Sequence, residues 1–416
     1  MPSTRLTRFI VLGLVLGVIA GYVCYAFYPG DSAEFSKVTA LLPTTFLRLI
    51  KMIIAPLVFC TLVVGIAKMG DIVMIGRVGG KALGWFIFAA IVSLTLGLLL
   101  VGFLEPGKAM HLPIPAADAS SGVQATGLSV EGFLSHTFPT SVIDAMSRNE
   151  ILQIVVFSLF FGAAAATLGD RAKSVISVLD AVAHIMLKVT GYVMLFAPLA
   201  VFGALASTIA KEGLGIIRVY GVFVGEFYLG ILLLWIVLIA LGWVFLGPAV
   251  LRLIRRMRAP VLLAFSTASS EAAYPKTLEE LERFGCSNRI ASFVLPVGYS
   301  FNLDGSMMYC TFAVMFIAQV YGIEISVGQQ IVMVAILLLT SKGIAGVPRA
   351  SLVVIAATLA QFNIPEAGLL LLLGVDHFLD MGRSATNVIG NSIATAVISK
   401  WEGELGEEQQ QTAEVS

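Results

Sequence analysis

Six polar residues near the C-terminal end of the chain have a spacing that places them on one face of a helix. Counted from the first, they stand at positions 0, 4, 7, 8, 11 and 15, and they are Asp376, Asp380, Arg383, Ser384, Asn387 and Asn391. Residues three or four positions apart share a side of an α-helix. The neighbouring residues are apolar, and an Asp or Arg at the centre of a bilayer costs about 2.5–3.5 kcal/mol, so this stripe must face protein or water. The acidic and basic residues could simply neutralise each other in helix packing, but six polar positions favour the binding of a charged solute.

A second polar cluster, NLDGS at 302–306, interrupts the apolar run 290–320. Gly305 can relax the helix and free backbone carbonyls, while Asp304 supplies negative charge; these oxygens suit a hard cation such as Na⁺. A simple helix kink is the alternative. Because the cluster lies within an apolar segment, we interpret it as part of a cation site.

Two further interruptions, Ser266–Pro275 and Ser341–Ser351, are rich in Ser, Gly or Pro. Helix ends at such breaks expose backbone N–H groups, and the helix dipole there favours anions. Each break could be an ordinary turn outside the membrane. Together they predict two re-entrant hairpins that gate one site, each followed by a full span, which is a duplication typical of transporters.

The elements that must position these residues are membrane spans. Of the 416 residues, 58% are apolar and 12% are charged, whereas soluble domains carry about 25% charge. The 26 basic residues balance the 26 acidic ones, so the net charge gives no reason to expect a nucleic acid partner. The four Cys and four His lack the spacing of metal sites or disulfides, and we expect no cofactor.

The first long apolar run, 9–28, is longer than the core of a signal peptide and has no cleavage site, so it is predicted to be a retained span. Further apolar runs lie at 43–67, 83–104, 151–168, 176–209 and 219–247. Lys and Arg gather in alternate loops in a way that favours a cytoplasmic N-terminus.

Four segments of the second half resemble one family. They are SSEAAYP at 269–275, NLDGS at 302–306, AGVP at 345–348 and DHFLDMGRSATN at 376–387. They resemble the dicarboxylate/amino acid:cation symporter family, which includes the glutamate transporters, and the resemblance extends over nearly the whole chain. It implies an all-α polytopic membrane protein with eight transmembrane helices and two re-entrant helical hairpins arranged as inverted repeats. It also implies a homotrimer in a bacterial inner membrane, with both termini in the cytoplasm.

The resemblance further implies a fixed scaffold and a transport domain that crosses the bilayer like an elevator. The scaffold would comprise spans 1 and 2 in 1–70, and an outer loop with spans 4 and 5 in 105–212. The transport domain would comprise span 3 in 71–104, span 6 in 213–258, hairpin 1 in 259–289, broken span 7 in 290–322, hairpin 2 in 323–364 and span 8 in 365–400. Residues 401–416 would form a disordered cytoplasmic tail.

Individual site roles follow from the same resemblance. Arg383 would pair with a substrate carboxylate, Asp380 with an α-amino group and Asn387 with the α-carboxylate. The other implied substrate contacts are Ser269, Ser270, Ser306, Val347 and Ser384. The candidate cation ligands are Gly298, Asn302, Asp304, Asn387 and Asn391.

Asp380 directs the choice of substrate. Relatives that carry C4-dicarboxylates tend to have Ser at this position, because succinate or malate has no ammonium group. An unpaired Asp would penalise such a substrate. The sequence therefore predicts a symporter for L-glutamate or L-aspartate, with a C4-dicarboxylate symporter as the alternative. An intramembrane aspartyl protease would need a GxGD setting that neither Asp304 nor Asp380 has, so we expect no enzyme. A passive anion channel is also disfavoured, because it would not need Asp380 paired with Arg383.

Several positions that bear on the coupling ion differ from those of sodium-coupled relatives. Sodium-coupled relatives have Asp where this chain has Asn391, and a Thr-Ser pair where it has Ala89 and Ala90. Cys310 stands where relatives have Gln or a protonatable Glu, and Arg349 replaces a hairpin glycine. These departures favour H⁺ coupling and leave Na⁺ open.

Overall fold

The computed structural model describes residues 3–69, 72–109, 134–135, 137–213, 215–340, 350–373 and 375–406. These ranges contain helices and one isolated bridge, between Cys286 and Leu405. The α-helices are α1 (Ser3–Phe27), α2 (Ser32–Met69), α3 (Ile72–Leu104), α4 (Pro106–Ala109), α6 (Val142–Arg148), α7 (Ile151–Leu168), α8 (Lys173–Val193), α9 (Ala197–Glu212), α10 (Gly215–Leu246), α11 (Ala249–Arg256), α12 (Arg258–Thr267), α13 (Ser270–Phe284), α14 (Asn288–Phe301), α15 (Asp304–Val320), α16 (Val327–Thr340), α17 (Ala350–Gln361), α18 (Leu369–Leu373) and α19 (Asp376–Trp401). Short 3₁₀ turns lie at Gly169–Ala172, Met194–Phe196 and Glu366–Gly368.

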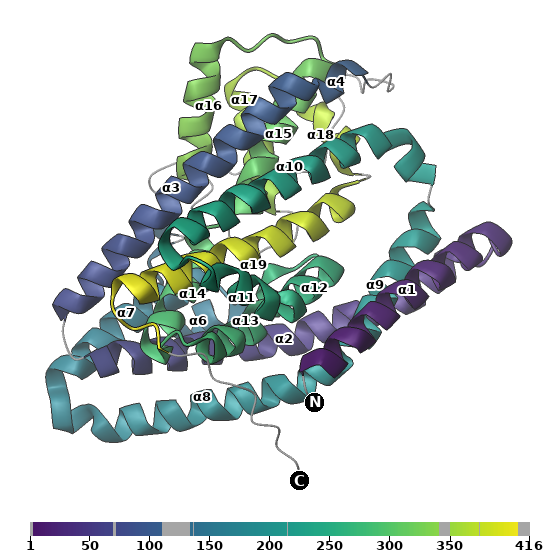
Figure 1. Ribbon diagram of the computed structural model, residues 1–416. Coiled ribbons are helices and arrows are strands. Elements are labelled where there is room, and N and C mark those ends of the chain that lie inside the picture. Colours follow the sequence, from purple (N-terminus) through teal and green to yellow (C-terminus); the bar gives the residue numbers. More distant parts are fainter. Residues whose placement is uncertain are drawn as a thin grey trace.

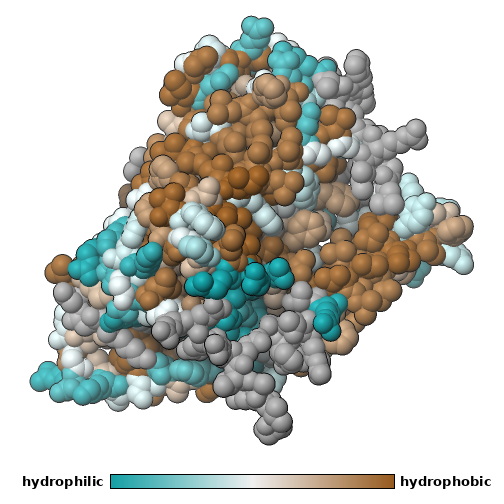
Figure 2. Space-filling view, in the orientation of Figure 1, coloured by the Kyte–Doolittle hydropathy of each residue, from teal (hydrophilic) through white to brown (hydrophobic). Residues whose placement is uncertain are grey.

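Several of these helices are long and apolar enough to cross a membrane. Within the described residues, six segments meet that condition by length and composition: Arg8–Phe27, Ser32–Ala67, Val73–Lys108, Ile151–Lys211, Tyr220–Leu246 and Asn288–Val320. Apolar side chains also cover broad areas of the surface (Figure 2), and on α10 Val222, Leu232 and Ile236 are each more than half exposed. Apolar surface on this scale suits contact with lipid. The predicted fold class, an all-α polytopic membrane protein, is confirmed.

The packing of the helices separates them into two groups (Figure 1). The first group contains α1, α2, α7, α8 and α9, which pack mainly on one another. The second contains α3, α10, α12, α13, α14, α15 and α19. The groups meet where α14 packs against α2 and α7, and where α12 packs against α1 and α9. The division into scaffold and transport domain stays a prediction.

The contact between α1 and α9 depends on a stripe of glycines. Gly13, Gly17 and Gly21 recur every fourth residue on α1, and a Cβ atom at each would lie 2.4–2.8 Å from a backbone oxygen of α9. Small residues at this spacing let two helices approach backbone to backbone within a membrane. The stripe therefore fixes α1 against α9.

The chain folds back on itself at α12 and α13, which pack against each other. Ala268 between them adopts a left-handed conformation with φ +49°, and the Ser269 side chain caps α13 by accepting a hydrogen bond from the Ala272 N–H. The helices α16 and α17 also pack together, and the connection between them, 341–349, lies outside the described residues.

Residues 402–406, here called the C-terminal strap, tie the end of α19 to other helices. Glu402 pairs with Arg77 and Lys81 of α3, each at 2.7 Å. Glu404 pairs with Arg289 of α14, and the Gly406 N–H donates to the Gly285 carbonyl at 2.8 Å. The strap therefore connects α3, α19 and the α13–α14 connection.

Candidate substrate and cation site

Arg383 is the centre of a charged cluster on α19. Its side chain is 1% exposed, and its Nη2 lies 3.1 Å from Asp376 Oδ1 and 3.0 Å from Asp380 Oδ1. Asp376 is 1% exposed, whereas Asp380 is 26% exposed. A buried charge needs a partner of opposite sign. Asp380 and Asp376, three and seven residues before Arg383 on the same helix, supply two. Asp380 is the carboxylate that a solute can reach.

Tyr309 of α15 holds the other face of this guanidinium. The Arg383 Cζ lies 4.1 Å from the centre of the Tyr309 ring, which is within cation–π range. The Tyr309 hydroxyl donates to Asp376 Oδ1 at 3.2 Å. Arg383 Nε and Nη1 are buried and have no hydrogen-bond partner in the described part of the chain. The guanidinium is thus fixed by its Nη2 and ring contacts, with two donor nitrogens left for a carboxylate.

The helix α10 fixes α19 through two hydrogen bonds. The Tyr228 hydroxyl donates to the Phe378 carbonyl at 2.6 Å, and the Trp235 Nε1–H donates to Thr386 Oγ1 at 2.8 Å. Neither residue was predicted from the sequence. Their seven-residue separation on a mostly apolar helix is the signal that could have found them, because it places them on one face.

The interruption between α14 and α15 gathers a second polar cluster. Asn302 and Leu303 are not helical, and the Asn302 Nδ2 donates to Asp304 Oδ2 at 3.1 Å and to Asn391 Oδ1 at 3.3 Å. Ser93 of α3 donates to Asp304 Oδ1 at 3.1 Å. All four residues are buried, and Asn302 Oδ1 has no hydrogen-bond partner within the described ranges. A buried carboxylate beside an unpartnered amide oxygen suits a dehydrated cation.

Two glycines make this cluster compact. A Cβ at Gly390 would lie 1.9 Å from Asp304 Oδ2, and one at Gly298 would lie 2.2 Å from Asn391 Oδ1. Neither position has room for a side chain. Gly298, one of the predicted cation ligands, therefore borders Asn391 of this cluster. Gly390 is a further residue that shapes the cluster.

Comparison with known proteins identifies the family. The sequence pattern of the sodium:dicarboxylate symporter family matches residues 6–401. The chain belongs to this family. It is 38% identical to the C4-dicarboxylate transport protein of Bacillus subtilis (strain 168) over 407 residues, which is 97% of this chain and 95% of that protein. It is 39% identical to the C4-dicarboxylate transport protein of Laribacter hongkongensis (strain HLHK9) over 412 residues, 97% and 92% of the two chains. It is 40% identical to the C4-dicarboxylate transport protein of Burkholderia multivorans (strain ATCC 17616 / 249) over 403 residues, 95% and 92%.

The family predicted from the sequence motifs is therefore confirmed, and the symporter is a transport protein rather than an enzyme. It is a multi-pass membrane protein, and its family's description pairs sodium with dicarboxylate.

Asn387 of the symporter connects α19 to the start of α15. Its Oδ1 accepts from the Gly305 N–H at 2.9 Å, and its Nδ2 donates to Ser306 Oγ at 3.3 Å. Asn387 and Ser306, two predicted substrate contacts, are thus bonded to each other. A substrate or cation bound by Asn387 would exchange these hydrogen bonds for its own.

The remaining predicted residues are placed as follows. Ser384 is buried on α19 beside Arg383, and Ser269 and Ser270 are partly buried at the start of α13. The helices α12 and α13 both pack against α19. Val347 lies outside the described residues, as does Arg349.

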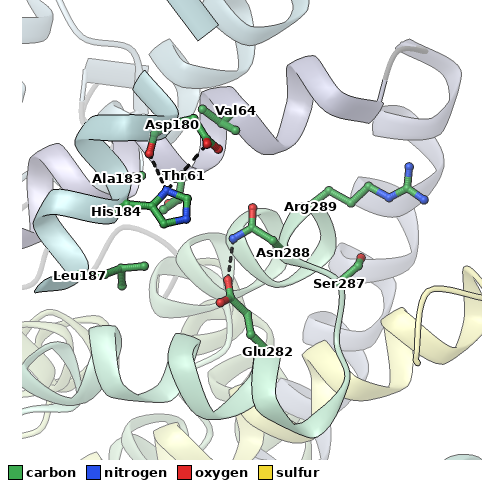
Figure 3. A pocket seen from close by; sticks show the side chains of 10 residues that line it. All are labelled: Thr61, Val64, Asp180, Ala183, His184, Leu187, Glu282, Ser287, Asn288 and Arg289. Carbon is green, nitrogen blue, oxygen red and sulfur yellow. Dashed lines mark hydrogen bonds and ion pairs between the residues drawn. The ribbon is translucent and has the colours of Figure 1, made fainter. Parts of the chain in front are cut away.

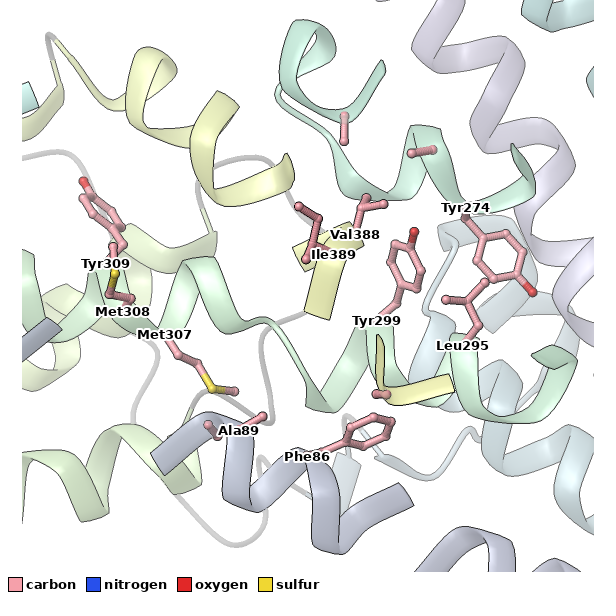
Figure 4. Packing of buried hydrophobic residues seen from close by; sticks show 14 of the residues in the cluster. Phe86, Ala89, Tyr274, Leu295, Tyr299, Met307, Met308, Tyr309, Val388 and Ile389 are labelled. Atoms are coloured by element: carbon pink, nitrogen blue, oxygen red, sulfur yellow. The ribbon is translucent and has the colours of Figure 1, made fainter. Parts of the chain in front are cut away.

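Buried apolar side chains pack around the site. Figure 4 shows Met307, Met308 and Tyr309 after the interruption, with Val388 and Ile389 of α19 and Ala89 of α3 lying close to the broken segment. Ala89 and Ala90 are buried, and Ser93, one turn farther along α3, provides the hydroxyl that reaches Asp304. The sequence analysis missed Ser93.

A separate pocket of about 490 Å³ lies between α2, α8 and the α13–α14 connection (Figure 3). His184 Nδ1 lies 2.8 Å from the Asp180 carbonyl, and Asn288 donates to Glu282 at 2.5 Å. None of the residues that line this pocket belongs to the two polar clusters. It is therefore distinct from the candidate site.

Proposed function

We propose that this protein is a secondary active symporter that takes up C4-dicarboxylates together with cations. The observation that carries the proposal is Arg383, which is held by Tyr309 and Asp376 and keeps Nε and Nη1 free to bind a carboxylate. Each of these two nitrogens can donate a charge-assisted hydrogen bond to a substrate carboxylate. The names of the relatives, each a C4-dicarboxylate transport protein, support this substrate class.

Acidic amino acids remain a second candidate because of Asp380. The prediction of L-glutamate or L-aspartate from the sequence is not confirmed, since the names of the relatives favour the C4-dicarboxylates. L-Aspartate is itself a C4-dicarboxylate that carries an amino group. The partly exposed Asp380, 3.0 Å from Arg383, would receive an ammonium group on such a skeleton.

The polar cluster at the α14–α15 interruption supports coupling to cations. The buried oxygens of Asn302, Asp304 and Asn391 would hold a cation, and the binding of a dianionic substrate beside them would favour it electrostatically. We infer coupling to H⁺, Na⁺ or both. An elevator movement, a homotrimer and a location in the bacterial inner membrane with cytoplasmic termini belong to the same proposal, as the family resemblance implies.

Uptake by the purified protein in liposomes tests this function. Radiolabelled succinate uptake would be measured with an inward Na⁺ gradient, an inward H⁺ gradient, both and neither, and with unlabelled L-aspartate, L-glutamate or a monocarboxylate as competitor. We expect gradient-dependent succinate accumulation that the monocarboxylate does not inhibit. Arg383→Lys, which keeps the charge but loses the planar fork, should abolish it. Uptake that proceeds equally well without any gradient would refute symport.

A further inference from the structure

One carboxylate of the second helix group faces the first group across their interface. Glu271, in the first turn of α13, is partly buried and lines a small cavity together with Ile54 and Val58 of α2 and Ile151 of α7. The wall opposite this carboxylate is therefore apolar and belongs to helices of the other group.

The charged groups that act on Glu271 come from both sides of this interface. Lys51 of α2 attracts the carboxylate, and Glu150, immediately before α7, repels it. Tyr274 of α13 and Tyr299 of α14 are the other titratable groups nearby, with ring centres 5.4 Å apart (Figure 4). The helices α11, α12 and α19 also pack on α13 but contribute no charged group that acts on Glu271 within the described residues.

Glu271 and Lys51 attract each other without touching. In the described part of the chain neither side chain makes a hydrogen bond or an ion pair with a side chain or the backbone. Lys51 and the N-terminal end of α13 favour the ionised carboxylate. The apolar wall and Glu150 favour the neutral carboxylic acid. These opposing influences leave the group able to take up and release a proton.

Glu271 also lies beside the predicted substrate contacts of this hairpin. Ser269 and Ser270 directly precede it in the chain, and α13 packs against α19, which carries Arg383. A dicarboxylate bound there brings negative charge toward Glu271. Protonation of Glu271 relieves the repulsion, so substrate and proton binding favour each other.

We propose that Glu271 binds the co-transported proton. A proton from water on one side of the membrane forms an O–H bond with the carboxylate, and the same bond breaks to release it on the other side. The neutral acid can move past the apolar residues of α2, whereas the ionised carboxylate is drawn to Lys51 and resists leaving it. This inference rests on the proposed symport and names the residue that couples it to H⁺.

Glu271→Gln, which mimics the protonated side chain, gives the first test in liposomes. We expect pH-gradient-driven succinate accumulation to fall at least about tenfold, while exchange of internal for external succinate, which needs no net proton movement, remains measurable. Glu324→Gln, at an exposed loop carboxylate between α15 and α16, is the matched control and should accumulate succinate like the unmodified protein.

The pH dependence of substrate binding gives the second test. Above its midpoint, binding that requires one proton weakens by about tenfold for each pH unit. Glu271→Gln should make succinate binding nearly independent of pH, and Lys51→Met, which removes the attracting cation, should move the midpoint to higher pH. A Glu271→Gln protein that keeps the normal pH dependence and accumulation would overturn the proposal. So would a Lys51→Met protein whose midpoint stays in place.

The same measurements distinguish failure of the proposed function from failure of the role of Glu271. If the unmodified protein neither binds nor exchanges succinate or L-aspartate, the proposed function is wrong. If it exchanges them but responds to Na⁺ gradients alone, the function stands and the role of Glu271 is refuted.

Discussion

Replacing Asp380 by Asn should change how the protein distinguishes L-aspartate from succinate. These substrates share the C4 skeleton with two carboxylates and differ by one ammonium group. Asp380 is the partly exposed carboxylate beside Arg383, while Asp376 is buried and bonded to Tyr309. If an amino-substituted substrate binds at Arg383, its ammonium group therefore lies against Asp380.

The size of this effect follows from the surroundings of Asp380. Two opposite charges about 4 Å apart attract by about 4 kcal/mol near a protein surface. Asp380 is 26% exposed and already 3.0 Å from Arg383, so water and the arginine reduce this value. The net worth of a hydrogen bond to a charged group, about 1.5–3 kcal/mol, is the better guide. That range corresponds to a change of about 10- to 150-fold in relative affinity.

Competition for labelled substrate measures this change. The inhibition constants of L-aspartate and succinate are determined for the unmodified protein and for Asp380→Asn, and their ratio is compared. The comparison forms a double cycle between substrate and side chain, so a general loss of affinity cancels. Asp376→Asn, which alters a carboxylate out of reach of the substrate, is the control and should leave the ratio within about threefold.

We expect Asp380→Asn to move the ratio by at least about tenfold toward succinate, whichever substrate the unmodified protein prefers. A change below about threefold would refute the assignment of Asp380 to the amino group. It would also remove the structural reason for considering acidic amino acids as substrates.

Three further substitutions test other parts of the structure. Gly390→Ala places a Cβ 1.9 Å from Asp304 Oδ2, and this overpacking should weaken cation binding by about 1–3 kcal/mol. Cation titration of the monodisperse protein measures the change, and cation-dependent uptake should fall with it. Tyr309→Phe keeps the ring under the guanidinium but loses the bond to Asp376, so succinate affinity should fall about 2- to 12-fold; an unchanged affinity would contradict this role. Burial opposes ionisation of Glu402, but hydrogen bonds from its two basic partners on α3 outweigh burial and lower the pKa of Glu402 below its ordinary 4.5. The stabilisation that Glu402 contributes is therefore present above pH 4.5 and lost as the pH falls through the lowered value. Glu402→Gln should reduce the free energy of unfolding at pH 7 by about 1 kcal/mol, and this loss should shrink as the pH falls through the lowered pKa. A loss of the same size at neutral and acidic pH would argue against an ionic contribution.

The sequence was most informative where polar residues stand in apolar surroundings. The spacing of Asp376, Asp380 and Arg383 predicts one helix face, and the structure joins them in one cluster on α19. The all-helical membrane fold and the family were also accessible, because long apolar runs and four distinctive segments define them. Such patterns involve residues that are close in the sequence, so they can be recognised without knowledge of the fold.

What the sequence did not reveal depends on contacts between distant segments. Ser93 is one hydroxyl in an apolar helix, and its role becomes visible only when α3 lies against Asp304. The substrate contact of Asn387 stays a prediction. Its hydrogen bond with the Gly305 N–H could not be predicted, because Gly305 lies 82 residues away in the sequence. Tyr228 likewise acts through α19 rather than through its own helix. No periodicity specifies such a partner.

The C-terminal strap has a consequence for the order in which the chain is assembled. Arg77 is made early in synthesis, but its partner Glu402 follows 325 residues later. The start of α3 and the α13–α14 connection therefore reach their final arrangement only after residue 402 has been synthesised. Contacts this far apart in sequence form slowly, because a long loop must close first. A nascent chain stalled before residue 402 would lack the Glu402 carboxylate that ties α3 to the end of α19, and in that form it should be an early target for membrane quality-control proteases.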